Sequence, residues 1–240
     1  MSDALPVGVV GVGALGRHHA RHLAGMYGAE LVGVYDTNIA RAAEVALACG
    51  CRAFTSLPDL LTCVEAVSVA VPTLFHHEVG LECLGRGVAV LMEKPIATSL
   101  DEADELMAEA KRQGMVLAVG HVERFNKAVR AALTVLDRPL YLEGIRLAPF
   151  QPRGTDVAVV LDLMIHDLDL ANHLVGGAPA IDEYRFADGS AVLAADVQRL
   201  MGAMAGFAPL FPATDALRGG LAGLAPASAW SLPVLAVETA

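Results

Sequence analysis

The sequence predicts an α/β protein that begins with a doubly wound parallel sheet and continues into an incomplete α+β unit. Up to about residue 120, short apolar runs rich in β-branched residues alternate with amphipathic segments rich in alanine and leucine. Beyond that point the pattern changes, and in the last part of the chain alanine, glycine, leucine and proline dominate without strand-like alternation. We therefore expect a first domain at 1–120, a partial second domain at 121–194 and an atypical tail of low charge at 195–240.

The first domain contains five expected strands separated by four expected helices. The strands are continuous apolar runs at 6–10, 30–35, 66–71, 88–92 and 115–119. The helices are amphipathic segments at 14–25, 38–49, 74–86 and 99–113. Ser99 and Glu102 form a capping box at the start of the last of these helices. Apolar strands that alternate with helices are typical of a parallel sheet whose two faces are both covered.

The second domain shows fewer elements. Helices are expected at 124–137 and 159–174, and strands at 140–148 and within 184–194. The tail after residue 195 has no clear strand alternation, so we expect no ordinary run of strands there.

Composition narrows the class of protein. The chain has 240 residues, of which 55% are hydrophobic, so it is long enough to bury a large core. A net charge of −10 argues against a nucleic-acid-binding surface. Cysteines at 49, 51, 63 and 83 lack the C-x-x-C spacing of a zinc site, so we expect free thiols in a reducing cytoplasm. No signal-peptide pattern opens the chain, and prolines interrupt its most apolar stretch, so we expect no membrane anchor.

A glycine-rich turn follows the first expected strand and opens the first expected helix. Gly11, Gly13 and Gly16 have the spacing G-x-G-x-x-G, with Ala14 and Leu15 between the last two. Gly11 permits a tight turn, Gly13 lets the backbone approach a pyrophosphate, and Gly16 lets the helix pack close to the strand. The helix N-terminus would then bind the pyrophosphate. The pattern predicts a dinucleotide-binding Rossmann domain, and a tight turn without a ligand is the alternative.

The second expected strand is followed by Asp36, about 20–25 residues after the glycine turn. A carboxylate at this place accepts hydrogen bonds from the ribose hydroxyls of the adenosine and repels a 2′-phosphate, so NAD is favoured over NADP. Arg41 is close enough in sequence to weaken that preference. His18, His19 and His22 follow on the first helix. His18 and His22 lie one turn apart and could suit a metal, but a solvated helix face is the preferred interpretation.

The segment after the expected strand at 66–71 carries further candidates. Ligands of an open parallel sheet bind beyond the carboxyl ends of its strands. We therefore expect Pro72 and Thr73 beside the nicotinamide half of the cofactor. His76, one turn later, is expected to reach the same edge, and His77 is expected to face solvent.

Glu93, Lys94 and Pro95 directly follow the expected strand at 88–92. A lysine at this place would point into the cleft, where its ammonium can polarise a substrate hydroxyl or carbonyl. A nearby cofactor cation can depress the pKa of such a lysine. A surface turn with a solvated lysine is the alternative, and the residues alone favour neither.

The last expected helix of the second domain holds ionisable groups in an apolar sequence. On a helix of ~3.6 residues per turn, Asp162, His166, Asp169 and His173 fall in one stripe roughly 60° wide. Such a stripe is an ordinary solvent face, the lining of a polar cleft, or a metal site. A metal site that also uses Asp167 is disfavoured, because consecutive helix positions diverge by ~100°. We therefore expect no metal.

Taken in order, these segments resemble one family. They are the glycine turn, Asp36, the V-P-T…H segment, Glu93–Lys94–Pro95, GHVERFN at 120–126, and the D-x-x-x-H of Asp162 and His166. Over roughly residues 5–180 they resemble the Gfo/Idh/MocA oxidoreductases. The resemblance implies a Rossmann domain, a second α/β domain on an open and mainly antiparallel sheet, and hydride transfer between a sugar or polyol carbon and NAD(P). It implies that Lys94 and His166 are the acid–base residues and that Asp162 orients the substrate or the histidine, with Asp169 and His173 continuing toward the rim of the cleft.

A finer resemblance, carried by GHVERFN and the segment 146–170, is to the branch that oxidises UDP-N-acetylglucosamine at C3. It implies a nucleotide-sugar substrate. Arg146 and Arg153 could then clamp the diphosphate, as guanidinium groups do, with plain surface charge as the alternative. Three residues at the expected domain junction could contact either cofactor or sugar: Glu123, Arg124 and Asn126.

The chain departs from the family after the catalytic helix. The second-domain sheet of the family continues there, and here only 184–194 suggests part of it. We therefore expect an apparently truncated C-terminus. This leaves open an NAD-binding pseudoenzyme, or a truncated family member without turnover, as the alternative to an active dehydrogenase. The expected partner is a small-molecule sugar, and a homo-oligomer is in doubt because the sheet is incomplete.

Overall fold

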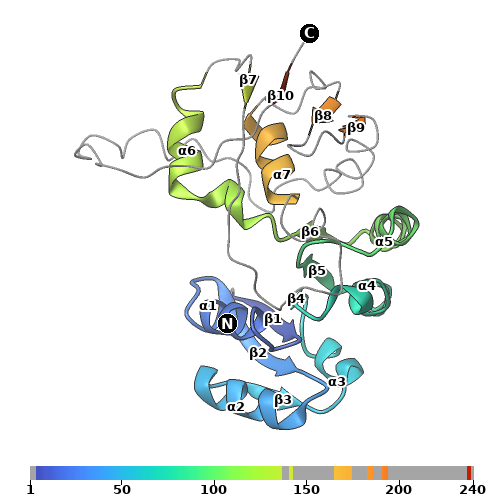
Figure 1. Ribbon diagram of the computed structural model, residues 1–240. Helices are drawn as coiled ribbons and strands as arrows, with labels where there is room; N and C mark the ends of the chain where they lie inside the picture. Colours follow the sequence, from blue (N-terminus) through green and yellow to red (C-terminus); the bar gives the residue numbers. More distant parts are fainter. Residues whose placement is uncertain are drawn as a thin grey trace, which may run out of the picture. The chain divides into compact units, whose positions relative to one another are not determined.

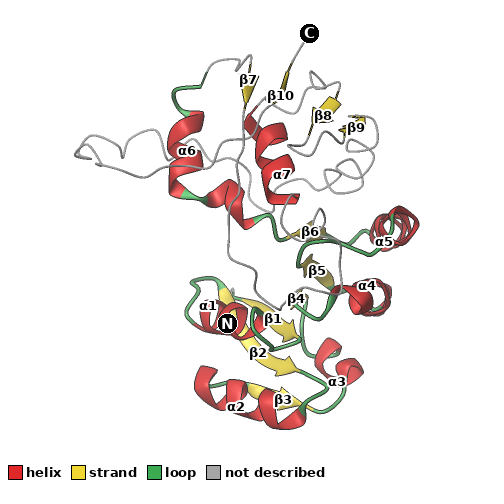
Figure 2. Ribbon diagram, viewed as in Figure 1, coloured by secondary structure: helices red, strands yellow, loops and turns green. Residues whose placement is uncertain are grey.

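A computed structural model describes residues 4–136, 141–142, 165–174, 183–185, 191–193 and 237–238. Of these, the residues up to His121 belong to one compact unit, and those from Val122 onward to a second. Figures 1 and 2 label and colour their helices and strands. Across the described residues, no helix combines the length and the apolar character that are needed to cross a membrane.

The first unit is built on a six-stranded parallel sheet with the strand order β3-β2-β1-β4-β5-β6. The strands are β1 (Leu5–Val10), β2 (Ala29–Tyr35), β3 (Arg52–Phe54), β4 (Ala66–Val69), β5 (Ala89–Met92) and β6 (Leu117–Val119). From β1 the chain builds outward through β2 and β3, and it then returns to β4 on the other side of β1 (Figure 1). This doubly wound Rossmann sheet is the predicted fold. Its ligands are expected beyond the carboxyl ends of the strands beside the reversal.

Helices connect these strands: α1 (Gly16–Ala24), α2 (Ile39–Cys49), α3 (Leu57–Leu61), the 3₁₀ turn η1 (Thr73–Phe75), α4 (His76–Gly85) and α5 (Leu100–Gln113). Right-handed crossovers place α1 and α2 on one face of the sheet and α4 and α5 on the other. The four predicted helices are confirmed. The sequence analysis did not predict β3 or α3, because three and five residues are too few to display a period.

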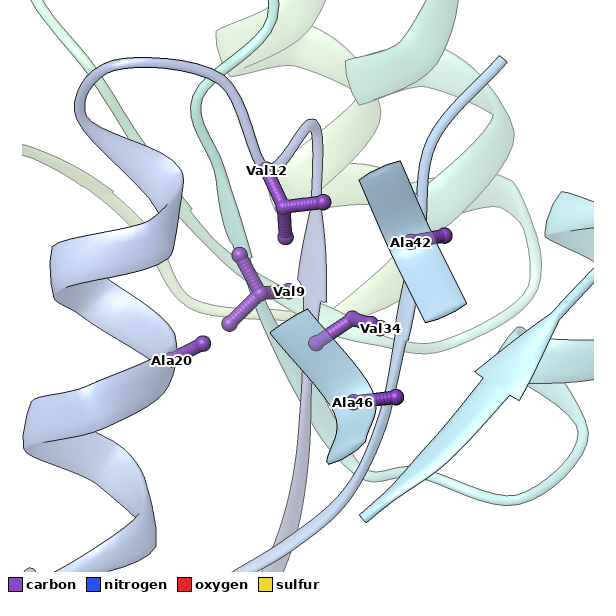
Figure 3. Packing of buried hydrophobic residues seen from close by; sticks show 6 residues of the cluster. All are labelled: Val9, Val12, Ala20, Val34, Ala42 and Ala46. Carbon is purple, nitrogen blue, oxygen red and sulfur yellow. The ribbon is translucent and has the colours of Figure 1, made fainter. Parts of the chain in front are cut away.

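A core of small and β-branched residues holds α1 and α2 against β1 and β2 (Figure 3). Its fully or almost fully buried members are Val9, Val12, Ala20, Val34, Ala42 and Ala46. The helices contribute alanines and the strands contribute valines, so the helix backbones approach the sheet closely. This close approach fixes the loops that leave β1 and β2.

Side chains cap most helices of this unit, but the predicted capping box is only half correct. Ser99 Oγ accepts a hydrogen bond from the N–H of Glu102 (3.3 Å), as predicted. Glu102 Oε2 does not return to Ser99. It accepts from the hydroxyl (2.6 Å) and the N–H (2.9 Å) of Thr98, because the threonine offers two donors. The Thr98 hydroxyl is the main cause that holds the pKa of Glu102 below its usual value.

The second unit is described in separate pieces. They are η2 (Val122–Phe125), α6 (Lys127–Leu133), α7 (Ile165–Leu174), and the antiparallel pairs β7 (Tyr141–Leu142) with β10 (Val237–Glu238) and β8 (Glu183–Arg185) with β9 (Ala191–Leu193). The helix expected at 124–137 is confirmed in α6, and the strands expected within 184–194 correspond to β8 and β9. The sequence analysis did not predict β10, because the tail lacks strand alternation.

Candidate functional site

The glycine turn after β1 has the geometry that its sequence predicts. Gly11 has a φ of +81°, and a Cβ at this position would lie 2.9 Å from the carbonyl oxygen of Ala70. A Cβ on Gly16 would lie only 1.8 Å from the carbonyl oxygen of Gly11. Only glycine therefore lets α1 begin so close to the end of β1. The tight turn and the close approach of the helix are confirmed.

The start of α1 borders an open groove of about 330 Å³, which Gly13, Ala14, Arg17 and Arg41 help to line. A Cβ on Gly13 would meet only the Arg41 guanidinium, at 3.4 Å, so the backbone here is open to a ligand. No side chain caps α1 at Leu15, which leaves its first N–H groups unblocked by a cap. These features fit the pyrophosphate of a dinucleotide, which binds to free N–H groups at a helix N-terminus.

Asp36 directly follows β2, and only 7% of its surface is exposed. Its Oδ2 accepts a hydrogen bond from the N–H of Val12 (2.9 Å), and its Oδ1 accepts from the N–H of Asn38 (2.7 Å). Arg41 Nη1 lies 3.8 Å from Oδ2. Each carboxylate oxygen can accept more than one hydrogen bond, so Asp36 is fixed beside the glycine turn with capacity left for ribose hydroxyls.

The loops after β4 and β5 are joined by a buried histidine. Pro72 is exposed and Thr73 is buried at the end of β4. His76 is 1% exposed, with Nδ1 2.7 Å from the carbonyl oxygen of Pro95 and Nε2 2.9 Å from that of Val71. Burial lowers the pKa of His76, and the two carbonyl contacts oppose this only in part. With both nitrogens engaged, the geometry favours a loop-joining role for His76 over the predicted cofactor contact.

Glu93 directly follows β5, and it is also 7% exposed. Its Oε1 lies 3.1 Å from Nε2 of His19, and its Oε2 accepts from the N–H of Lys94 (3.2 Å). The other nitrogen of His19, Nδ1, lies 2.7 Å from Oγ of Ser68 on β4. Burial alone would raise the pKa of Glu93, but His19 and Lys94 together hold it below the usual value. Lys94 itself is partly buried.

The sequence analysis missed the place of His19. It grouped the three histidines of α1 together, and His18 and His22 are indeed exposed. His19 lies one turn after the last glycine of the turn, on the side of α1 that faces the sheet, and that spacing was the available signal. His77, which was expected to face solvent, is one-quarter exposed and lies 2.8 Å from Oε2 of Glu105 on α5.

In the second unit, Arg124 forms a forked ion pair with Asp169. Nε of Arg124 lies 3.0 and 2.8 Å from the two carboxylate oxygens, and Nη2 also donates to Oδ1. Asp169 is 1% exposed, so the expectation that it continues toward the rim of a cleft is wrong. It is buried because Arg124 satisfies its charge. His166 and His173 are partly exposed on the same helix, α7.

The other candidates at the start of this unit make local bonds. Asn126 Oδ1 accepts from the N–H of Ala128 (3.0 Å) and so caps α6, while its Nδ2 donates to Glu123 Oε2 (3.1 Å). These bonds give both side chains a structural task, and their contact with a ligand stays a prediction. Three further candidates lie outside the described residues: Arg146, Arg153 and Asp162.

Known proteins share this architecture. Residues 5–121 match the family model GFO_IDH_MocA, described as "Oxidoreductase family, NAD-binding Rossmann fold". The chain is 46% identical over 173 residues to the UDP-N-acetylglucosamine 3-dehydrogenase of Acidithiobacillus ferrooxidans, a match that covers 72% of this chain and 55% of that protein. The chain spans about half the length of the curated relatives it matches.

Solved structures agree. UDP-N-acetylglucosamine 3-dehydrogenase GnnA from Acidithiobacillus ferrooxidans superimposes with a TM-score of 0.69 at 44% identity, over 75% of this chain and 58% of that one. GenD2 from gentamicin A biosynthesis, solved in complex with NAD, superimposes with a TM-score of 0.68 at 26% identity, over 80% and 65% of the two chains. With the strand order and the glycine-turn geometry, these matches identify residues 5–121 as an NAD-binding Rossmann domain of the Gfo/Idh/MocA oxidoreductase family.

Proposed function

We propose that the chain is an NAD-dependent oxidoreductase that moves a hydride between NAD and a sugar, with C3 of UDP-N-acetylglucosamine as the reacting carbon. One observation carries the proposal: Gly13 opens onto a groove directly beside the buried carboxylate of Asp36, in a Rossmann domain of this family. The 46% identity to a UDP-N-acetylglucosamine 3-dehydrogenase supports the choice of substrate.

In this proposal, the turn from Gly11 to Gly16 holds the pyrophosphate, and Asp36 holds the adenosine ribose. NAD is proposed over NADP because the carboxylate of Asp36 would repel a 2′-phosphate. Arg41, whose guanidinium lies 3.8 Å from that carboxylate, reduces this discrimination without reversing it. The bound nicotinamide supplies the hydride chemistry.

Pro72, Thr73, Glu93 and Lys94 are proposed for the nicotinamide half of the cofactor. They follow β4 and β5, which are neighbours in the sheet, so these side chains leave from the same edge. In an open parallel sheet, that edge beside the strand reversal is where ligands bind.

Lys94 and His166 are proposed as the acid–base residues. Oxidation of a sugar hydroxyl releases a proton, and a lysine or a histidine is suited to hold it near neutral pH. Asp162 is proposed to orient His166 or the substrate, and Arg146 and Arg153 to bind the diphosphate. The sugar is proposed to contact the segment from Glu123 to Asn126, within limits set by the local bonds of its side chains.

The test is turnover of the full chain with NAD and UDP-N-acetylglucosamine, followed by the absorbance of NADH. We expect Lys94→Met to lower kcat by roughly 10²- to 10⁴-fold and to leave the NADH affinity unchanged. Lys111→Met, on the exposed surface of α5, is the matched control and should keep full activity. A wild-type chain that binds NADH but shows no turnover in either direction would overturn the proposal in favour of a binding module.

A further inference from the structure

The proposed cofactor site leaves one buried polar chain of the first unit unexplained. It runs from Ser68 on β4 to His19 on α1 (2.7 Å) and on to Glu93 after β5 (3.1 Å). Glu93 then accepts from the N–H of Lys94 (3.2 Å). Four segments of the chain therefore meet around one carboxylate at the edge of the sheet.

The order serine, histidine, carboxylate is also that of a nucleophilic triad. Ser68 is only 3% exposed within a central strand of the sheet, so its hydroxyl has no access to a substrate. Its task is to hold Nδ1 of His19, which directs Nε2 at Glu93.

Glu93 is fixed from three sides. His19 holds Oε1, and the N–H of Lys94 holds Oε2. On the third side lies Gly120, where a Cβ would come within 3.2 Å of Oε1, so there is little room for another side-chain orientation. The N–H of Glu93 donates to the carbonyl of Val69 (2.9 Å), which ties the same residue to β4. A carboxylate held in this way can define the path of the backbone that follows it.

We propose that His19 is a positioning residue: through Glu93 it fixes the backbone of Lys94 and so sets where the lysine side chain begins. The catalytic consequence rests on the proposed function of Lys94. His19 lies one turn into α1, whose N-terminus is the proposed pyrophosphate site. The contact therefore joins the two ends of the cofactor site through one helix.

The first experiment needs no turnover. In the full chain, nuclear magnetic resonance follows hydrogen exchange at the Lys94 amide and the pH titration of the Glu93 carboxyl group. We expect His19→Ala to speed exchange at Lys94 by at least about tenfold and to move the Glu93 titration to higher pH. His18→Ala, an exposed neighbour on the same helix, is the matched control and should change neither.

His19→Gln covers the case in which His19→Ala does not fold. A glutamine N–H can still donate to Glu93 but carries no charge, so the Lys94 amide should stay protected while the Glu93 titration still moves to higher pH. Unchanged titration of Glu93 in a folded His19→Gln chain overturns the proposal. So does unchanged exchange at Lys94 in a folded His19→Ala chain.

The second experiment separates positioning from a purely structural role. We expect His19→Ala to lower kcat by roughly ten- to hundredfold with little change in KM for NAD. Added to Lys94→Met, the same change should lower kcat no further, because His19 acts through the lysine. Full kcat in folded His19→Ala overturns the proposal. If the wild-type chain has no turnover, the proposed function fails, and the exchange and titration measurements alone decide the role of His19.

Discussion

Asp36 and Glu93 hold matching places at two ends of one sheet edge and are fixed in different ways. Each directly follows a parallel strand, and each is 7% exposed. The backbone N–H groups of Val12 and Asn38 hold Asp36. Glu93 depends on the side chain of His19, together with one backbone N–H.

The difference shows which parts of a site a sequence reveals. The donors to Asp36 belong to the glycine turn and to the next two residues, so the motif that predicts the carboxylate also brings its partners. The partner of Glu93 comes from a helix far away in the sequence, and it can gain or lose a proton. Backbone donors cannot titrate, so Asp36 should keep its setting over a wide pH range, whereas that of Glu93 should depend on pH.

The largest effect is expected from the turn that brings Val12 to Asp36. Gly16→Ala would place a Cβ 1.8 Å from the Gly11 carbonyl oxygen and should lower the free energy of unfolding by at least about 3 kcal/mol. Gly13→Ala, which meets only Arg41 at 3.4 Å, is the matched control and should cost less than about 1 kcal/mol while weakening NADH binding. Urea denaturation measures both, and equal costs would contradict the structure.

A smaller effect is expected from Asp36 itself. Asp36→Ala leaves the N–H groups of Val12 and Asn38 without their acceptor, so the free energy of unfolding should fall by about 1–3 kcal/mol. NADH affinity should fall by at least about tenfold, since a charged acceptor for the ribose is lost. Urea denaturation and fluorescence titration with NADH check the two effects. The exposed Asp104→Asn serves as control, and unchanged NADH affinity in Asp36→Ala would remove Asp36 from the site.

Glu93 should show its difference through pH. Its pKa is lowered in the folded chain, so its charge stabilises the fold above the pKa of the unfolded chain, about 4.3, and this contribution is lost as the pH falls through the folded pKa. The advantage of wild type over Glu93→Gln in unfolding free energy should therefore be full near neutral pH and shrink below about pH 4. A constant difference across this range would show that the charge of Glu93 plays no part.

The smallest effect concerns Arg41. Its side chain is 46% exposed and its guanidinium lies 3.8 Å from Asp36, so Arg41→Ala should change the free energy of unfolding by no more than about 0.5 kcal/mol. Arg86→Ala, which breaks a similarly exposed pair with Glu82, gives the reference. A loss well above that of the reference would mean that Asp36 needs a side-chain partner after all.

The sequence predicted the features that repeat or that depend on one residue type. Apolar runs marked the longer strands, and the glycines marked the turn, because no other residue has room there. Strand β3 and helix α3 escaped because they are too short to display a period. His19 escaped because nothing in its own neighbourhood announces Glu93.

The second unit illustrates the same limit. Arg124 and Asn126 were predicted to contact ligands because of their position in a family motif. The structure shows them in an ion pair with Asp169 and in the cap of α6, and polar residue types alone cannot separate these tasks from binding. Lys94 follows its strand as predicted, yet its proton-transfer role remains a prediction.

The most direct test of the account is thermal unfolding of the full chain with and without NADH, at about 100 times its Kd, with NADPH for comparison. Binding at that level should add about 2.7 kcal/mol to the stability of the folded chain, which corresponds to a rise in Tm of roughly 5 to 10 °C. We expect this rise with NADH, a smaller rise with NADPH, and none with NADH for Gly13→Ala. A cooperative transition in wild type that NADH leaves in place would contradict the assignment of the glycine turn and Asp36 as the cofactor site.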